Sequence, residues 1–256
     1  MKLNYRYGSI IGKKSMRNED FILTSEIMDR FGIYNQKIDK RGLLFVLCDG
    51  IGGYNSGHIA SKKCAEELTQ RFYESDEKIE DYKKWFSDEL TKINDILIEL
   101  GEITDDFDKK GTTIVSLVIK KDLAFVVNIG DSRLYINYDD RFVQITEDRT
   151  KVWELFKSGR IRKNDLIRFP EKNIITQAVG IDKDIEINFY KIDLLEKYNI
   201  LMFRDGLTDV VIDTDLKIVF LQTLDLEEIV DNLHSLALRN RSNDDISLII
   251  VTNYLK

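Results

Sequence analysis

Short apolar runs, several of them joined by only a few residues, limit how this chain can fold. Runs of this kind, bounded by turn-forming or charged residues, have the length and composition of buried strands. Five of them are Leu43–Cys48, Thr113–Ile119, Ala124–Ile129, Ile200–Phe203 and Ile246–Val251. We expect a hairpin turn at Asp122 and a further strand that begins at Arg133. Connections this short join antiparallel neighbours, because parallel neighbours need a long crossover.

Four other segments repeat apolar residues at the spacing of one helix face. They are residues 56–73, 82–100, 151–158 and 226–238. The third helix is expected to stop at Gly159, and Asp225 is expected to cap the fourth. Few strands alternate one-for-one with helices, so a doubly wound parallel sheet fits poorly. Two antiparallel sheets covered by helices fit better, and the lack of a repeat or low-complexity tract favours one domain over residues 1–256.

The charge balance and the cysteine content exclude several classes of protein. Lys and Arg total 38 against 45 Asp and Glu, which gives a formal net charge of −7 and argues against a protein that coats nucleic acid. The first residues lack the apolar segment of a signal peptide, and no run approaches the about 18 apolar residues of a membrane-spanning helix. Cys48 and Cys64 are expected to be buried free thiols. The sequence therefore predicts a cytoplasmic protein that binds neither nucleic acid nor membrane.

Acidic residues stand at the ends of four of the expected strands and directly before one further apolar run, Phe21–Leu23, several of them beside glycine. They are Glu19 with Asp20, Asp49, Asp131, Asp205, and Asp244 with Asp245. If these ends meet, bare carboxylates would repel one another, and divalent cations would resolve the conflict. Oxygen ligands suit Mg²⁺ and Mn²⁺, and two such ions can polarise a bridging water for attack on phosphorus. The alternative is that these acids are solvated turn residues, which are common at strand ends.

Six sequence blocks occur in a fixed order along the chain. They are RNED (17–20), CDGIGGYNSGHIAS (48–61), GTT (111–113), VNIGDSRLY (127–135), RDGLTD (204–209) and SNDDISLIIV (242–251). Together they resemble the signature blocks of the metal-dependent protein phosphatases of type 2C, in their compact bacterial form. The resemblance implies an α+β fold, a four-layer α-β-β-α sandwich of two stacked antiparallel sheets flanked by helices. It also implies a flap-like segment at about 146–180, near the catalytic cleft.

The same resemblance implies a metal centre of two Mn²⁺ or Mg²⁺ ions, with a weaker third. The implied metal ligands are Glu19, Asp20, Asp49, Gly50, Asp131, Asp205, Asp209 and Asp244. In this family the aspartate at Asp49 bridges both ions, and the carbonyl of Gly50 is a further ligand. The positions of Asp131 and Asp209 belong to the weaker third site.

Hydrolysis of phosphoserine and phosphothreonine monoesters on proteins is the implied reaction, with a water acidified by two cations as the nucleophile. Asp49, Asp205 and Asp244 would be its catalytic residues. The implied partners are phosphorylated proteins, such as a serine/threonine kinase or its targets, and the protein is expected to be a monomer. The alternative is a non-catalytic phosphatase-like regulatory or binding module. The retained acids speak against that module, because a dead site has no physical need for mutually repelling carboxylates.

Two positions that bear on substrate binding and on the metals depart from the family. Its phosphate-binding arginine is replaced by Ser15, which cannot offer the bidentate fork of a guanidinium. Lys13, Lys14 and Arg17 are candidates to bind the phosphate instead, although all three could be ordinary surface cations.

The second departure is Arg204, which stands where the family usually has serine. We expect its side chain to point outward or to pair with a carboxylate, and reaching the substrate is the alternative. Asp245 stands where the family usually has asparagine, and no ligand role is assigned to it.

Overall fold

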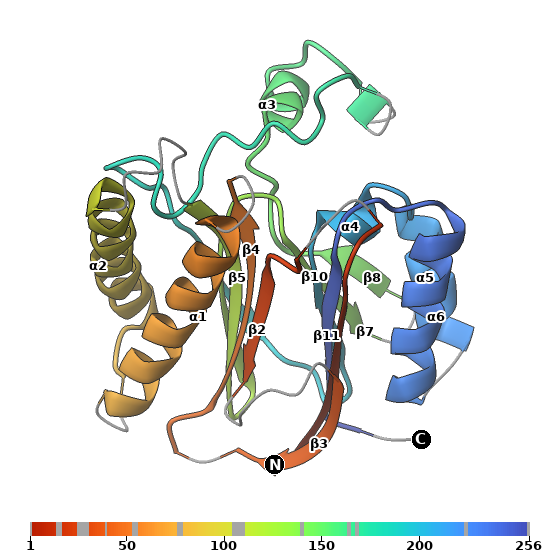
Figure 1. Cartoon of the computed structure of the whole chain (residues 1–256). Helices are drawn as coiled ribbons and strands as arrows, with labels where there is room; N and C mark the ends of the chain where they lie inside the picture. Colours follow the sequence, from red (N-terminus) through yellow and green to blue (C-terminus); the bar gives the residue numbers. More distant parts are fainter. Residues whose placement is uncertain are drawn as a thin grey trace.

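Two antiparallel sheets stacked face to face form the centre of the structure, which is a computed structural model (Figure 1). It describes residues 2–13, 17–24, 31–38, 40–52, 56–75, 79–103, 111–138, 141–162, 165–166, 169–222 and 225–254. Among these residues, one sheet has six strands in the order β3-β1-β11-β10-β7-β8, and the other has five in the order β2-β4-β5-β6-β9.

The strands of the six-stranded sheet are β1 (Lys2–Ile10), β3 (Phe31–Lys37), β7 (Arg133–Tyr138), β8 (Arg141–Gln144), β10 (Asn199–Phe203) and β11 (Ile246–Thr252). Those of the five-stranded sheet are β2 (Asp20–Thr24), β4 (Leu43–Ile51), β5 (Gly111–Lys120), β6 (Leu123–Ile129) and β9 (Asn188–Asp193). Every strand pair in the described ranges is antiparallel. All the strands expected from apolar runs are therefore confirmed.

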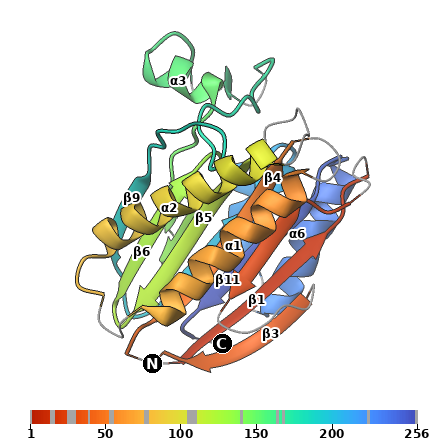
Figure 2. The ribbon, with the colours of Figure 1, turned by 60° about the vertical axis from the view of Figure 1, so that its left-hand side comes forward.

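Helices cover the outer face of each sheet. The five-stranded sheet lies under α1 (Ser56–Glu74) and α2 (Tyr82–Ile103), as Figure 2 shows, and the six-stranded sheet lies under α5 (Asp213–Gln222) and α6 (Leu226–Arg239). The short helix α4 (Asp205–Thr208) follows β10, and α3 (Lys151–Lys157) lies beyond the strand ends. The expected four-layer α-β-β-α sandwich is confirmed.

Strand alternation explains why the expected strands are apolar throughout. In β4, Phe45 and Leu47 pack between the sheets, whereas Leu44, Val46 and Cys48 pack under α1 and α2. Because successive side chains point to opposite faces, a strand with both faces covered needs an unbroken apolar sequence. Cys48 and Cys64 lie in the helix-side cluster as buried free cysteines, as expected.

Two helix ends agree with their sequence signals. The side chain of Asp225 accepts hydrogen bonds from the backbone N–H groups of Glu227 and Glu228, so it caps α6 as expected. After α3, Gly159 adopts a φ of +73°, the left-handed conformation in which glycine commonly ends a helix. None of the helices in the described ranges combines the length and the apolar character that crossing a bilayer requires.

Candidate metal centre

The sheet topology brings the acidic strand ends to one edge of the sandwich. Asp20 begins β2 and lies directly opposite Asp49, near the end of β4. Asp205 lies two residues after the end of β10, and Asp244 lies two residues before the start of the neighbouring strand β11. Because antiparallel neighbours start where the adjacent strand ends, these segments meet although they are far apart in sequence.

Glycines at this edge let backbones approach where a side chain would collide. A Cβ on Gly50 would overlap the backbone of Gly57 at the start of α1, and a Cβ on Gly206 would overlap the carbonyl oxygen of Asp245. The glycine after Asp49 and the glycine after Asp205 therefore each allow a second segment to pack against the site.

The side chain of Arg204 lies at the centre of the aspartates and is 5% exposed. Its Nη2 is 2.7 Å from Oδ2 of Asp49 and 2.8 Å from Oδ1 of Asp205. Its Nη1 is 3.1 Å from Oδ1 of Asp20 and 3.1 Å from Oδ1 of Asp244. One buried guanidinium thus pairs with four carboxylates from four segments. Here we call Arg204 and these four aspartates the acidic cluster.

The expectation that Arg204 points outward is wrong, and the expectation that it pairs with a carboxylate is confirmed. In β10, Ile200 and Met202 face the core between the sheets, while Leu201 and Phe203 face the helices. Arg204 continues the inward series by strand alternation, which directs it between the sheets.

Burial is the largest influence on the pKa of four aspartates at this edge. It raises the pKa of Asp49, Asp131 and Asp205, repulsion from neighbouring carboxylates adds to the rise, and Arg204 partly opposes it. Burial likewise raises the pKa of Asp20 to about 7. One guanidinium therefore does not balance the negative charge gathered here.

Burial alone would lower the pKa of Arg204, but the four paired aspartates outweigh it and raise that pKa above its usual range. The guanidinium is consequently charged at any pH at which the protein folds.

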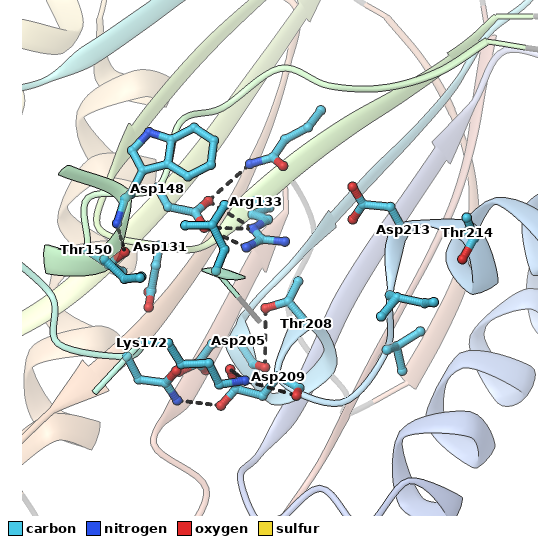
Figure 3. A pocket seen from close by; sticks show the side chains of 17 residues that line it. Asp131, Arg133, Asp148, Thr150, Lys172, Asp205, Thr208, Asp209, Asp213 and Thr214 are labelled. Atoms are coloured by element: carbon cyan, nitrogen blue, oxygen red, sulfur yellow. Dashed lines mark hydrogen bonds and ion pairs between the residues drawn. The ribbon is translucent and has the colours of Figure 1, made fainter. Parts of the chain in front are cut away.

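Asp131 and Asp209 line a second part of the site, a cavity of about 300 Å³ that Asp205 also lines (Figure 3). Asp131 is buried, and its Oδ1 has no hydrogen-bond partner among the described residues. Asp209 pairs with Nζ of Lys172 at 3.0 Å and accepts a hydrogen bond from the side-chain amide of Asn173. Both residues of the expected third site thus line the same cavity.

Asp245 holds the segment that carries Glu19, a role that the sequence did not reveal. Its Oδ1 accepts a hydrogen bond from the backbone N–H of Gly12 at 2.7 Å, and its Oδ2 accepts one from the backbone N–H of Glu19 at 2.8 Å. The carbonyl of Glu19 in turn accepts from the backbone N–H of Gly50 at 3.2 Å. Glu19, half-buried, and Gly50 are thereby connected to the acidic cluster.

Hydroxyl groups of the GTT and GDSR blocks tie β5 to the same edge. The hydroxyl of Thr112 donates to the backbone carbonyl of Asp49 at 2.8 Å. The hydroxyls of Thr113 and Ser132 form a hydrogen bond of 2.9 Å. These bonds hold the backbone of Asp49 and the side chain of Ser132, which is next to Asp131.

The cations expected to bind phosphate are only partly described. Lys13 and Arg17 are exposed, on either side of the segment that contains Lys14 and Ser15, and those two residues lie outside the described ranges. Lys13 follows Gly12, whose backbone N–H binds Asp245. Their role in phosphate binding stays a prediction.

The donor set fits hard divalent cations in its chemistry and charge. All the side-chain donors are carboxylate oxygens, which Mg²⁺ and Mn²⁺ prefer, and the buried Oδ1 of Asp131 has no other partner among the described residues. However, no three His, Cys, Asp or Glu side chains within the described ranges are grouped closely enough to hold a metal ion. The carboxylates of the acidic cluster are not grouped around a common point because the guanidinium of Arg204 lies among them and pairs with each.

Comparisons with known proteins agree over most of the chain. A family model described as protein phosphatase 2C matches residues 12–154. The serine/threonine phosphatase stp of Listeria welshimeri is 27% identical over 229 residues, 89% of this chain and 90% of that protein. Protein phosphatase PhpP of Streptococcus pneumoniae is 26% identical over 244 residues, 94% of each.

Solved structures show the same similarity in three dimensions. The serine/threonine phosphatase Stp1 from Staphylococcus aureus superposes with a TM-score of 0.87 at 29% identity, covering 98% of this chain and 94% of that chain. The serine/threonine phosphatase PstP/Ppp of Mycobacterium tuberculosis has a TM-score of 0.85 at 26% identity, covering 98% of both. The fold is therefore shared over nearly the whole length.

Proposed function

The chain belongs to the protein phosphatase 2C family, whose model matches residues 12–154, and from this premise we propose which residues carry out its reaction. It is a metal-dependent phosphatase that acts on phosphorylated serine and threonine of proteins. The alternative of a non-catalytic regulatory or binding module is not favoured.

The observation that carries the residue assignment is the convergence of Asp20, Asp49, Asp205 and Asp244 on one buried guanidinium. We assign Asp49, Asp205 and Asp244 as the residues that would hold two divalent cations, Mn²⁺ or Mg²⁺. This assignment is supported by the oxygen-only donor set and by the burial of Asp49 and Asp205, which raises the pKa of both and is offset when a cation binds their charged form.

Three further sets of residues are assigned supporting roles around the two cations. The carbonyl of Gly50 is proposed as a ligand, and Glu19 and Asp20 act close to the metals or through water. Asp131 and Asp209, which line one cavity with Asp205, are proposed as a weaker third site.

Divalent cations bound there would supply a water of lowered pKa and offset the charge that develops on the phosphoryl group. The protein's own residues do the positioning. The carboxylates fix the cations, and Asp245 holds the backbone of Gly12 and Glu19 against the cluster. The cysteines take no part, because Cys48 and Cys64 are buried in the helix-side core.

Substrate capture is proposed for Lys13, Lys14 and Arg17, in place of the arginine that Ser15 replaces. We propose that the segment 146–180 acts as a flap beside the cavity, because Asp148, Thr150 and Trp153 line its wall.

The substrates are phosphorylated proteins, and we propose a serine/threonine kinase or its targets among them. We also propose that the protein is a monomer, that its single domain spans residues 1–256, and that it works in the cytoplasm. The buried free thiols support that location, because free cysteines are typical of reducing compartments.

Release of phosphate from a phosphothreonine peptide, measured with Mn²⁺ and then with excess EDTA, tests the assignment. We expect turnover that EDTA abolishes and that Asp205→Asn reduces by about a hundredfold or more, in line with the loss of a group that stabilises transition-state charge. Asp225→Asn is the matched control, since it removes one negative charge at a distant, exposed position while asparagine still caps α6. Wild-type turnover in Asp205→Asn would contradict the assignment.

A further inference from the structure

Arg204 is the residue of the acidic cluster that a simple metal centre does not explain. It contributes a permanent positive charge to the place where the carboxylates converge. Its guanidinium uses both terminal nitrogens, Nη2 for Asp49 and Asp205 and Nη1 for Asp20 and Asp244. Nη1 also donates to the backbone carbonyl of Asp245 at 3.2 Å. Arg204 is therefore a buried arginine held by several ion pairs and a hydrogen bond, unlike an arginine in a surface ion pair.

The carboxylates that hold the guanidinium are those assigned to the cations. A divalent ion among Asp49, Asp205 and Asp244 would stand within a few ångströms of a like charge in a buried site, where repulsion is weakly screened. The two cations therefore cannot bind these carboxylates while the guanidinium of Arg204 remains paired with them. The cavity of about 300 Å³ that Asp205 also lines lies directly beside it.

We infer that Arg204 is an internal counter-ion of the metal-free protein, and that divalent cations bind by displacing its guanidinium from Asp49, Asp205 and Asp244. This inference rests on the proposed metal centre. It makes Arg204 a positioning residue with two effects of opposite sign. It offsets part of the charge of the buried acids when metal is absent, and it lowers the affinity for the metal that replaces it.

Binding of Mn²⁺ to the purified, EDTA-treated protein tests the inference, with free Mn²⁺ counted by electron paramagnetic resonance. Arg204→Gln removes the charge and keeps a similar side-chain length. We expect it to bind Mn²⁺ at least about tenfold more tightly than the wild type, because no buried ion pairs have to be broken. We also expect its melting temperature in EDTA to fall, since the carboxylates lose their counter-ion.

Arg6→Gln is the matched control. Arg6 is also a buried arginine, with a side chain 8% exposed, but it pairs with Glu227 and Asp231 at helix α6, away from the acidic cluster. Its Mn²⁺ affinity should stay within about twofold of the wild type, as for independent sites. Wild-type or weaker Mn²⁺ affinity in Arg204→Gln would overturn the displacement of Arg204 while leaving the metal centre intact. Failure of the wild type, Arg204→Gln and Arg6→Gln alike to bind Mn²⁺ would overturn the metal centre and the inference with it.

A measurement on the wild type keeps the inference testable if Arg204→Gln does not fold without metal. The arginine Nε–H signals are recorded by nuclear magnetic resonance during a titration with Mg²⁺, which is diamagnetic. We expect one buried, exchange-protected signal to shift and lose protection as Mg²⁺ saturates the protein. If every protected arginine signal stays unchanged at saturating Mg²⁺, Arg204 is not displaced.

Discussion

Replacing Asp20 by asparagine should stabilise the metal-free protein at pH 8, although it removes a proposed metal-site residue. The side chain of Asp20 is completely buried, and burial, above all, raises its pKa to about 7. Arg204 and Ser247 lower this pKa and Asp245 and Asp205 raise it, but none of these influences exceeds that of burial. In the unfolded chain the same group has a pKa of about 3.9.

The sign of the effect follows from which state binds the proton more tightly. The folded protein does, so the contribution of Asp20 to stability is complete below about pH 4 and is lost as the pH rises through about 7. At about 1.4 kcal/mol for each pKa unit, the metal-free wild type should lose about 2 kcal/mol between pH 5 and pH 7 through this group, and about 3 kcal/mol by pH 8. Asparagine cannot ionise, so Asp20→Asn should not show that loss.

Chemical denaturation in EDTA at pH 5, 6, 7 and 8 measures the difference. The stability gap between Asp20→Asn and the wild type should widen by about 3 kcal/mol from pH 5 to pH 8. Asp95→Asn, at an exposed position of α2, is the control and should follow the wild type at every pH. A gap that stays constant with pH would refute the reasoning, because Asp20 would then titrate alike in both states.

Three further changes separate the roles of neighbouring groups. Asp245→Ala leaves the backbone N–H groups of Gly12 and Glu19 without their acceptor. It should lower the free energy of unfolding, measured by chemical denaturation, by about 2 kcal/mol or more. A loss below about 0.5 kcal/mol would count against the positioning role of Asp245. Leu90→Ala, in the core under α2, should cost about 2–5 kcal/mol with unchanged Mn²⁺ affinity, and a changed affinity would show that this core acts on the site. Cys64→Ala should keep metal-dependent turnover and lose about 1 kcal/mol of stability, so a folded but inactive variant would implicate the thiol.

The sequence predicts the buried strands well and the amphipathic ones poorly. Strands such as β4 are covered on both faces, and their unbroken apolar runs are easily recognised. Strand β1 alternates Leu3, Tyr5 and Tyr7 with polar residues, and its polar Asn4 and Arg6 are also buried, so no apolar run marks it. A period-two pattern was present there and would have identified the strand.

The acids of the site could be predicted because each follows or precedes a strand, and strand ends meet at sheet edges. The direction of Arg204 could not be predicted from its neighbours in sequence, since both faces of β10 are buried and apolar. Which face a side chain takes beyond the last strand residue depends on the register of the sheet, and that is known only from the structure. The two hydrogen bonds of Asp245 likewise join segments more than 200 residues apart.

A crystal soaked in Mn²⁺ is the most direct test of whether acids far apart in sequence converge to hold the catalytic ions. Its diffraction is measured at a wavelength where manganese scatters anomalously. We expect anomalous density in contact with Asp49, Asp205 and Asp244, with the guanidinium of Arg204 moved away from those carboxylates. Manganese found only at exposed acids, with Arg204 still paired to Asp49 and Asp205 at saturating Mn²⁺, would contradict the assignment.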